Sequence, residues 1–301
     1  MSVEIPASVL VNLTGRDTSS VVNLTTHPMH GGTGAATAAV ARLTIQTRER
    51  DGRRLDELRV IRKTFRPLSS GRHRHGAREP SHWTYWKREL LAYGSGVLPA
   101  GPGLRAPRCY GVSGSTIYLE DVGDRPADVR TSARQLGAWQ ALAEPPNVAW
   151  LSGHQLSQRI EASDLDWSNV RSDNRVKCLW DARHDLLAEL AEVAPVLSHG
   201  DFHQANLRAY GSDTATLDWG TLGLAPVGAD LAHLALSTQR DLLAEYLSGL
   251  NGTFSAHVVV RAYRITLALV GSSRVHWMLN EGIDVPDGYV DFLWDNRPRP
   301  R

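Results

Sequence analysis

Residues 197–220 read LSHGDFHQANLRAYGSDTATLDWG, and this stretch decides how the rest of the chain is interpreted. Its oxygen-bearing side chains include Asp201, Asn206 five residues later, and Asp218 near the end. Between them, a Gly-Ser-Asp turn at residues 211–213 is flanked by short strand-like runs. This pattern predicts that Asp218 ends a strand folded back beside the loop of Asp201 and Asn206. Two carboxylates and an amide oxygen are therefore expected around one point.

This set of oxygen atoms favours one kind of chemistry. Carboxylate and amide oxygens are hard ligands that suit Mg²⁺, an ion that keeps several waters and binds substrate phosphates. A carboxylate beside such an ion, without being its main ligand, can accept a proton from a hydroxyl group. The stretch therefore predicts metal-assisted chemistry at a phosphate.

The order His199-Gly200-Asp201, then Asn206, then Asp218 at a strand end resembles the catalytic loop and metal-binding strand of the aminoglycoside phosphotransferase family, which includes choline-kinase-like enzymes. The resemblance implies an α+β, protein-kinase-like bilobal fold. It also implies Mg²⁺-dependent transfer of the γ-phosphate of ATP or GTP to a hydroxyl of a small molecule. Asp201 would be the catalytic base, Asn206 and Asp218 the Mg²⁺ ligands, and His199 a support of the loop backbone.

A glycine turn in the N-terminal part resembles the phosphate-covering turn of the same family. Residues 30–35 read HGGTGA, so Gly31, Gly32 and Gly34 lie just before a predicted strand. Small residues there would let backbone N–H groups approach phosphates closely. The spacing departs from the glycine loop of protein kinases.

Two charged residues resemble the family's phosphate-binding ion pair. Lys63 lies on a predicted strand, where it shares a face with Ile61 and Phe65, while the neighbouring Arg62 points to the other face and is the alternative. Glu89, on a predicted helix, resembles the glutamate that pairs with this lysine. Such a pair would hold the ammonium group against the α- and β-phosphates.

Two further segments carry the resemblance into the second half of the chain. Residues 117–122 (IYLEDV) resemble the strand that links the lobes, where the backbone near Glu120 and Val122 would hydrogen-bond the adenine edge. Asp230, in the Gly-Ala-Asp-Leu segment at residues 228–231, resembles the residue that braces the catalytic loop by accepting backbone N–H bonds. We also expect Asp230 to cap its own helix.

The periodicity of apolar residues divides the chain into two parts. Strands are predicted at residues 38–47, 58–65 and 116–122, with an Asp-Gly hairpin turn at 51–52 and a helix at 81–93 capped by Ser81. Later helices are predicted at residues 127–142, 174–193, 228–237, 240–250 and 258–279. We therefore expect a nucleotide-binding lobe at 1–118, a hinge at 119–124, and a catalytic and acceptor-binding lobe at 125–301.

Charge is unevenly placed along the 301 residues. The whole chain has 33 basic and 32 acidic residues, but residues 1–118 carry a net charge of +9 and residues 119–301 a net charge of −8. An acidic second lobe favours a cationic acceptor, and the resemblance points the same way, to an aminoglycoside or another basic antibiotic. A metabolic kinase for a sugar, choline-like or nucleoside substrate is the alternative.

Two kinds of side chain in the second lobe could contact the acceptor. Acidic side chains that could rim the acceptor site are Asp164, Asp166, Glu281, Asp284, Asp287 and Asp291. Tryptophans that could line it are Trp150, Trp167, Trp180, Trp277 and Trp294.

Composition narrows the remaining function classes. The balanced charge does not indicate a nucleic-acid or membrane binder, and the apolar stretch at residues 258–270 is interrupted by two arginines. Only two cysteines are present, far apart, which suits a reducing cytoplasm and not a disulfide framework. We expect a cytoplasmic monomer or homodimer. The arginine-rich residues 48–78 leave an RNA-associated module open, and a nucleotide-binding pseudoenzyme is a further alternative.

Overall fold

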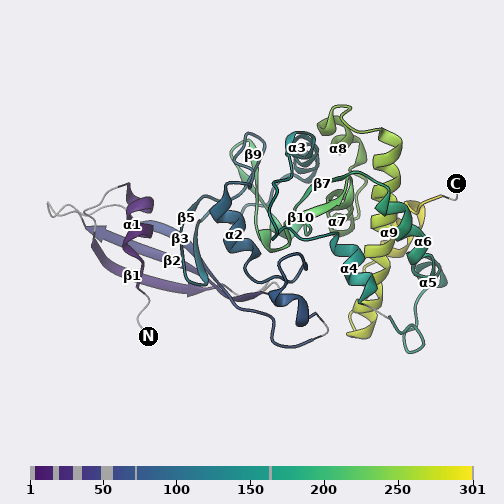
Figure 1. Cartoon of the computed structure of the whole chain (residues 1–301), viewed down its shortest axis with the longest axis horizontal. Coiled ribbons are helices and arrows are strands. Elements are labelled where there is room, and N and C mark those ends of the chain that lie inside the picture. Colours follow the sequence, from purple (N-terminus) through teal and green to yellow (C-terminus); the bar gives the residue numbers. More distant parts are fainter. Residues whose placement is uncertain are drawn as a thin grey trace.

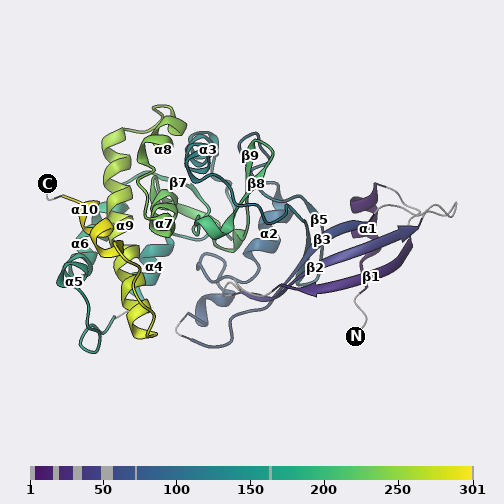
Figure 2. The ribbon, with the colours of Figure 1, turned by 180° about the vertical axis from the view of Figure 1, so that it is seen from behind.

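The computed structural model describes residues 4–15, 20–29, 36–48, 57–71, 73–162 and 165–299, and these form two lobes (Figure 1). A strand-rich lobe built mainly from the first part of the chain lies at one end, and a helical lobe lies at the other. The view from behind shows the same division (Figure 2). The predicted bilobal α+β class is confirmed. The predicted glycines Gly31, Gly32 and Gly34 and the Asp-Gly turn at 51–52 lie outside the described residues.

Five antiparallel strands form the sheet of the smaller lobe, in the order β1-β2-β3-β6-β5. Their bounds are Ser20–Pro28 (β1), Thr37–Arg48 (β2), Leu58–Phe65 (β3), Cys109–Ser113 (β5) and Thr116–Glu120 (β6). Along β2, Ala41, Leu43 and Ile45 are buried at every second position, which is the period of a strand with one face in a core. The strands predicted at 38–47, 58–65 and 116–122 are therefore confirmed to within two residues at each end.

A helix covers each face of this sheet. Helix α1 (Ala7–Thr14) places Val9 against Leu43 and Ile45 on one face. Helix α2 (Arg88–Ser95) places Leu90 against Phe65 on the other. Since Lys63 shares the Phe65 face of β3, its side chain points toward α2.

Helix α2 begins seven residues later than the sequence predicts. Residues 73–87, which we call the interlobe strap, contain the short η1 helix (His75–Arg78) and turns instead of a longer helix. The reason is that the carbonyl groups near Ser81 have partners from outside the segment. The Ser81 carbonyl accepts from the N–H of Gly153 at 3.0 Å, and the carbonyls of Pro80 and His82 each accept from the Arg88 guanidinium at 2.7 Å. The predicted Ser81 cap was wrong.

The larger lobe packs helices around one apolar core (Figure 1). Its helices are α3 (Val129–Leu142), α4 (Gln155–Glu161), α5 (Asn174–Asp181), α6 (Arg183–Ala191), α7 (Ala229–Thr238), α8 (Leu243–Leu250), α9 (Ala256–Asn280) and α10 (Tyr289–Asp295). The single helix predicted at 174–193 is two helices that meet at Ala182, so that Val176 and Leu190 both reach this core. None of the helices in the described part of the chain is long and apolar enough to cross a membrane.

Two small sheets position the predicted site between the lobes. Strand β7 (Pro195–Ser198) pairs with β10 (Gly223–Pro226), and β9 (Asp213–Thr216) lies between β4 (Leu104–Arg105) and β8 (Leu207–Tyr210). The short helices η2 (Gln204–Asn206) and η3 (Trp219–Thr221) follow β7 and β9. Every predicted loop residue therefore emerges from the end of a short strand.

Candidate active site

The β8–β9 hairpin brings Asp218 back beside the loop at residues 199–206, which we call the Asp201 loop. Two hydrogen bonds fix this approach. The N–H of Leu217 donates to the Asn206 carbonyl at 2.9 Å, and the ring Nε2 of His199 lies 2.9 Å from the Leu217 carbonyl. Asp218 has a left-handed backbone with φ 65°, a conformation that costs energy for a residue with a side chain. The predicted grouping of Asp201, Asn206 and Asp218 is present.

His199 is a buried link within the loop. Its Nδ1 accepts the backbone N–H of Asp201 at 3.2 Å, so Nε2 carries the proton donated to Leu217. Burial lowers the pKa of His199 and keeps the ring neutral. His199 therefore supports the loop backbone, because each of its two ring nitrogens makes a hydrogen bond within the site.

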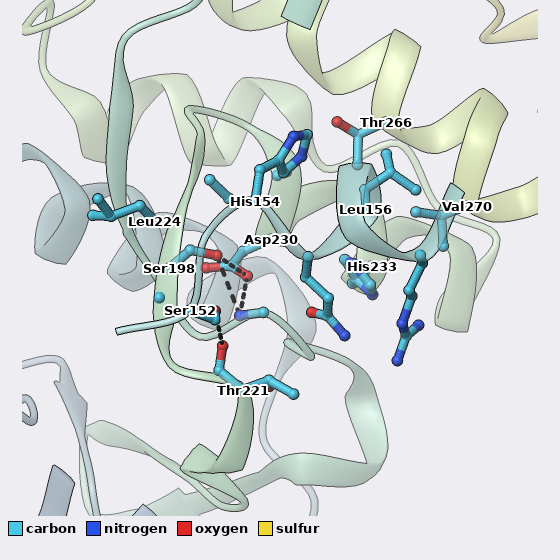
Figure 3. Close-up of a pocket in the computed structure, with 16 residues that line it drawn as sticks. Ser152, His154, Leu156, Ser198, Thr221, Leu224, Asp230, His233, Thr266 and Val270 are labelled. Carbon is cyan, nitrogen blue, oxygen red and sulfur yellow. Dashed lines mark hydrogen bonds between the residues drawn. The ribbon is translucent and has the colours of Figure 1, made fainter. Parts of the chain in front are cut away.

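Asp230 holds the start of the same loop from behind. Its carboxylate accepts backbone N–H groups of His199 at 2.8 Å and Gly200 at 2.9 Å. It also accepts from the side chains of Ser198 at 2.8 Å and Gln140 at 3.0 Å. Figure 3 shows the bond between Asp230 and Ser198. Four donors satisfy a carboxylate that is almost fully buried, although burial raises its pKa.

One expectation for Asp230 was wrong. It lies in the first turn of α7, where Gly228 is the N-cap, and no side chain caps the helix. The reason is that the Asp230 carboxylate is already committed to the Asp201 loop.

A buried ion pair joins the smaller lobe to Asp218. The ammonium Nζ of Lys63 lies 2.7 Å from Glu89 and 2.8 Å from Asp218. Burial opposes the charge on Lys63, but the two carboxylates together outweigh it and hold the pKa of Lys63 above its usual value. Arg62, one position earlier, places its side chain on the opposite face of β3 and is only partly buried, so the buried cation at the site is Lys63.

Asp201 has its own set of neighbours. Its carboxylate lies 3.5 Å from the Nε2 of His203 and 4.0 Å from the Nδ1 of His233. Burial opposes ionisation of Asp201, but the hydrogen bond and charge of His203 outweigh it and hold the pKa below its usual range. The side chain is still 40% exposed, so a substrate can reach it.

A cleft of about 560 Å³ connects these groups with the strand that links the lobes. It is lined by Lys63, Asp201, Asn206 and Asp218 on one side and by residues 119–124 on the other. Val122, whose backbone is expected to bind the adenine edge, is part of this lining.

Glu120 also lines the cleft, but its backbone N–H donates to the Arg108 carbonyl at 2.8 Å and is not available to a nucleotide base. Its side chain binds Arg105 at 2.8 Å and Tyr210 at 2.7 Å.

The cleft offers a divalent cation two side-chain oxygen ligands, fewer than the ion needs in total. Within the described ranges, no group of three or more His, Cys, Asp or Glu side chains could hold a metal ion. Asn206 uses its Nδ2 to donate to the Asp201 carbonyl at 3.1 Å, which leaves its Oδ1 as a ligand atom. Asp218 receives Lys63 on Oδ1, which leaves Oδ2. Two hard oxygens fit an ion that takes its other ligands from phosphate and water.

The sequence reasoning missed two features of the site. Arg88, fully buried, donates to the carbonyl of Gly220 at 3.2 Å and to that of Trp150 at 2.8 Å, so α2 is attached to the larger lobe. A second cavity, of about 230 Å³, also contains Asp201 and Asp218 and is walled by Trp83 and other rings of the strap. The tryptophans expected at the acceptor site are absent from the described lining of both cavities: Trp150, Trp167, Trp180, Trp277 and Trp294.

A smaller cavity, of about 30 Å³, lies behind the Asp201 loop (Figure 3). Its lining includes His154, His233 and Thr266. The Nε2 of His154 and the Oγ1 of Thr266 are buried without a protein partner. This volume suits one or two water molecules, which would satisfy such atoms.

Two lobes, a buried lysine–glutamate pair in the smaller one and an aspartate–asparagine loop facing it define a kinase-like phosphotransferase. The profile of the phosphotransferase enzyme family matches residues 91–263, and the chain belongs to that family. It is therefore a small-molecule phosphotransferase.

Solved structures share this fold at low sequence identity. A choline/ethanolamine kinase family protein from Mesorhizobium loti is 14% identical with a TM-score of 0.55, over 90% of this chain and 86% of that one. Choline kinase LicA from Streptococcus pneumoniae is 14% identical with a TM-score of 0.52, over 92% of each chain. Amicoumacin kinase hAmiN, in complex with AMP-PNP, Ca²⁺ and Ami, is 10% identical with a TM-score of 0.51, over 90% and 86%. A search of curated protein sequences found no match.

Proposed function

We propose that the protein transfers the γ-phosphate of ATP or GTP to a hydroxyl group of a small molecule, and that Asp201, Asn206, Asp218 and Lys63 carry the reaction. The observation that carries this proposal is that all four side chains line one cleft of about 560 Å³ between the lobes. In this proposal residues 1–118 bind the nucleotide, residues 119–124 are the hinge, and residues 125–301 carry catalysis and the acceptor. The expected location is the cytoplasm.

Lys63 binds the α- and β-phosphates in this proposal. Its ammonium is held by Glu89 at 2.7 Å, and its raised pKa keeps it charged at neutral pH. The charge opposes that of the phosphates, and the buried pair fixes its position before substrate arrives. The turn with Gly31, Gly32 and Gly34 would add backbone N–H donors.

Asp201 accepts the hydroxyl proton of the acceptor. Its low pKa keeps it ionised, so its main contribution is to orient the hydroxyl for in-line attack, with proton transfer late in the reaction. A loose phosphoryl-transfer transition state requires little help from a strong base. His199 and Asp230 hold the loop that carries Asp201.

A divalent cation, for which we propose Mg²⁺, would neutralise the charge of the phosphate oxygens. The Asn206 Oδ1 and the Asp218 carboxylate are the protein atoms suited to hold it. Amicoumacin kinase hAmiN, which has the same fold, is described with AMP-PNP and Ca²⁺.

For the acceptor, we propose a cationic natural product such as a basic antibiotic, which would make the protein a resistance determinant. The net charge of −8 in residues 119–301 supports this. Of the acidic side chains expected at the rim, Asp291 pairs with Arg175 at 2.9 Å, and Asp164 lies outside the described residues. The second candidate is a metabolic kinase, favoured by the fold shared with choline kinase LicA.

The test is transfer of radiolabel from γ-labelled ATP with Mg²⁺ to a panel of acceptors. The panel contains kanamycin, choline and methyl glucoside, and Asp201→Asn is the matched inactive variant. Transfer to kanamycin alone supports the cationic antibiotic, and transfer to choline alone supports the metabolic kinase. Nucleotide binding without transfer to any member would leave the pseudoenzyme as the better description. Transfer that is not reduced in Asp201→Asn would refute the role proposed for Asp201.

A further inference from the structure

The cavity of about 230 Å³ is a second space at the reacting centre. It shares Asp201 and Asp218 with the nucleotide cleft, and its lining also includes Ala36, which follows the glycine turn. A group in this cavity would therefore lie beside the carboxylate proposed to accept the hydroxyl proton. This position suits the part of the acceptor that carries the reacting hydroxyl.

Aromatic rings form much of the wall. Trp83, Tyr85 and Trp86 come from the interlobe strap, and Phe65 comes from the end of β3. Flat rings supply large apolar area at low cost in side-chain entropy.

The strap is held rigidly against the larger lobe. Trp83 donates its backbone N–H to the side chain of Gln158 at 2.9 Å, and that side chain donates back to the Ser81 carbonyl at 3.0 Å. The Arg88 guanidinium binds the carbonyls of His82 and Trp83 at 2.7 and 2.9 Å. The aromatic wall is therefore in place before an acceptor binds, which lowers the cost of binding.

Each of these rings already has a protein cation near its centroid. The pairs and their distances are Lys63 and Phe65 at 5.4 Å, Lys87 and Trp86 at 5.3 Å, Arg88 and Tyr85 at 5.8 Å, and Arg159 and Trp83 at 4.1 Å. Of these four cations only Arg159 lines the cavity, and the lining also holds the carboxylates of Glu89, Asp201 and Asp218. What the rings themselves offer a ligand is therefore apolar surface.

The size of the cavity limits what enters. A cavity of about 150 Å³ is large enough to bind benzene. About 230 Å³ therefore accepts one six-membered ring with substituents, and the rest of a larger acceptor must lie outside it.

We propose that this cavity binds one apolar-faced or aromatic ring of the acceptor, placing a hydroxyl near or on that ring beside Asp201. This inference rests on the proposed function and deepens it, because it names the part of the acceptor that lies at the reacting centre.

The experiment compares two sugars that differ only in an aromatic ring, 4-nitrophenyl β-glucoside and methyl β-glucoside. Binding to the full chain is measured by titration calorimetry with AMP-PNP and Mg²⁺ present. The nitrophenyl compound is expected to bind about tenfold more tightly, the value for burial of about 60 Å² of apolar surface. Equal affinities, or no measurable binding of the nitrophenyl compound, would overturn the inference.

Two tryptophan variants assign the effect to the wall. Trp86→Ala is expected to remove the tenfold preference, with Trp86→Leu as the alternative if the alanine variant does not fold. Trp277→Ala is the matched control, because Trp277 is exposed on α9 and is absent from the described lining of this cavity. A preference that survives loss of Trp86 contradicts the inference.

The two levels of the proposal fail separately. Phosphate transfer to a hydroxyl compound with no ring preference overturns the ring inference and keeps the proposed function. If the protein prefers the aromatic ring but transfers phosphate to no acceptor, the ring inference is kept and the proposed function is overturned.

Discussion

Arg88 and Glu89 are consecutive residues of α2, and both are tied to the turn that carries Asp218. Glu89 reaches it through Lys63, whose ammonium contacts both carboxylates. Arg88 reaches it directly, by donating to the carbonyl of Gly220 at 3.2 Å. The helix of the smaller lobe is therefore fixed to the turn that carries Asp218 in the larger lobe at two adjacent points.

Replacing Arg88 tests this attachment. Burial lowers the pKa of Arg88 to about 10, and its guanidinium donates to five backbone carbonyls. Arg88→Met leaves these carbonyls without their donor, and we expect a loss of about 3–5 kcal/mol in the free energy of unfolding. Urea denaturation measures this loss, and kcat is expected to fall as Asp218 loses its support.

Arg88→Lys distinguishes positioning from simple stability. A lysine restores part of the hydrogen bonding but cannot span five carbonyls. We expect partial recovery of stability with kcat still reduced and KM for ATP changed less. Full recovery of kcat by Arg88→Lys would mean that Arg88 contributes only to folding.

Asp201→Asn removes the proposed proton acceptor while keeping the size of the side chain. We expect kcat to fall by about 100- to 10,000-fold, the range for a general base. ATP affinity, measured by calorimetry, should remain close to wild type. Asp181→Asn is the control, since Asp181 lies at the end of α5 in an exposed pair with Lys177 and is absent from the described lining of both cavities that contain Asp201. Wild-type turnover in Asp201→Asn would refute the assignment.

Lys63→Met leaves the buried Glu89 and the partly buried Asp218 without their shared cation. Removing one partner of a buried pair costs about 3–5 kcal/mol, so the melting temperature should fall markedly. KM for ATP should rise because the phosphates lose their ammonium partner. Lys177→Met is the matched control, since Lys177 forms only an exposed pair with Asp181, worth about 0.5 kcal/mol. Equal effects in the two variants would contradict a role for Lys63 at the site.

His154 is expected to make the free energy of unfolding sensitive to acid. Burial lowers its pKa to about 4, from an ordinary value near 6.5. The unfolded chain therefore binds a proton more readily than the folded one. The contribution of neutral His154 to stability is complete above about pH 6.5 and is lost progressively as the pH falls toward 4, by up to about 3 kcal/mol.

His154→Phe should flatten the stability profile between pH 6.5 and 4, measured by urea denaturation at several pH values. His257→Phe is the control because His257 is exposed at the start of α9. The prediction is wrong if both variants keep the wild-type slope.

The sequence predicts well what depends on local pattern. The alternation of apolar and polar residues in β2 and β3 predicts the bounds of these strands. The spacing of Asp201, Asn206 and Asp218 places them around one point, because a hairpin returns the chain within a few residues. The face of Lys63 follows from strand period alone. Features of this kind need no knowledge of distant segments.

What the sequence did not reveal depends on contacts between distant segments. Trp83 and Trp86 have helical spacing, but Arg88 and Gly153 bind the carbonyls that a helix would use. The segment held by these bonds places both rings in the lining of the cavity that contains Asp201. The commitment of Asp230 to the Asp201 loop, and not to its own helix, likewise appears only when residues about 30 positions apart meet.

The interlobe strap also bears on how the two halves can separate. Bonds from Ser81, Trp83 and Arg88 to the larger lobe close the edge of the molecule beside the aromatic wall. In the proposed division the chain itself crosses between the lobes at residues 119–124, where Arg42 of β2 also pairs with Asp121 at 2.7 Å and with Asp124 at 3.1 Å. The strap is therefore a second connection between the lobes, and we expect nucleotide exchange to proceed without a wide separation of the two halves.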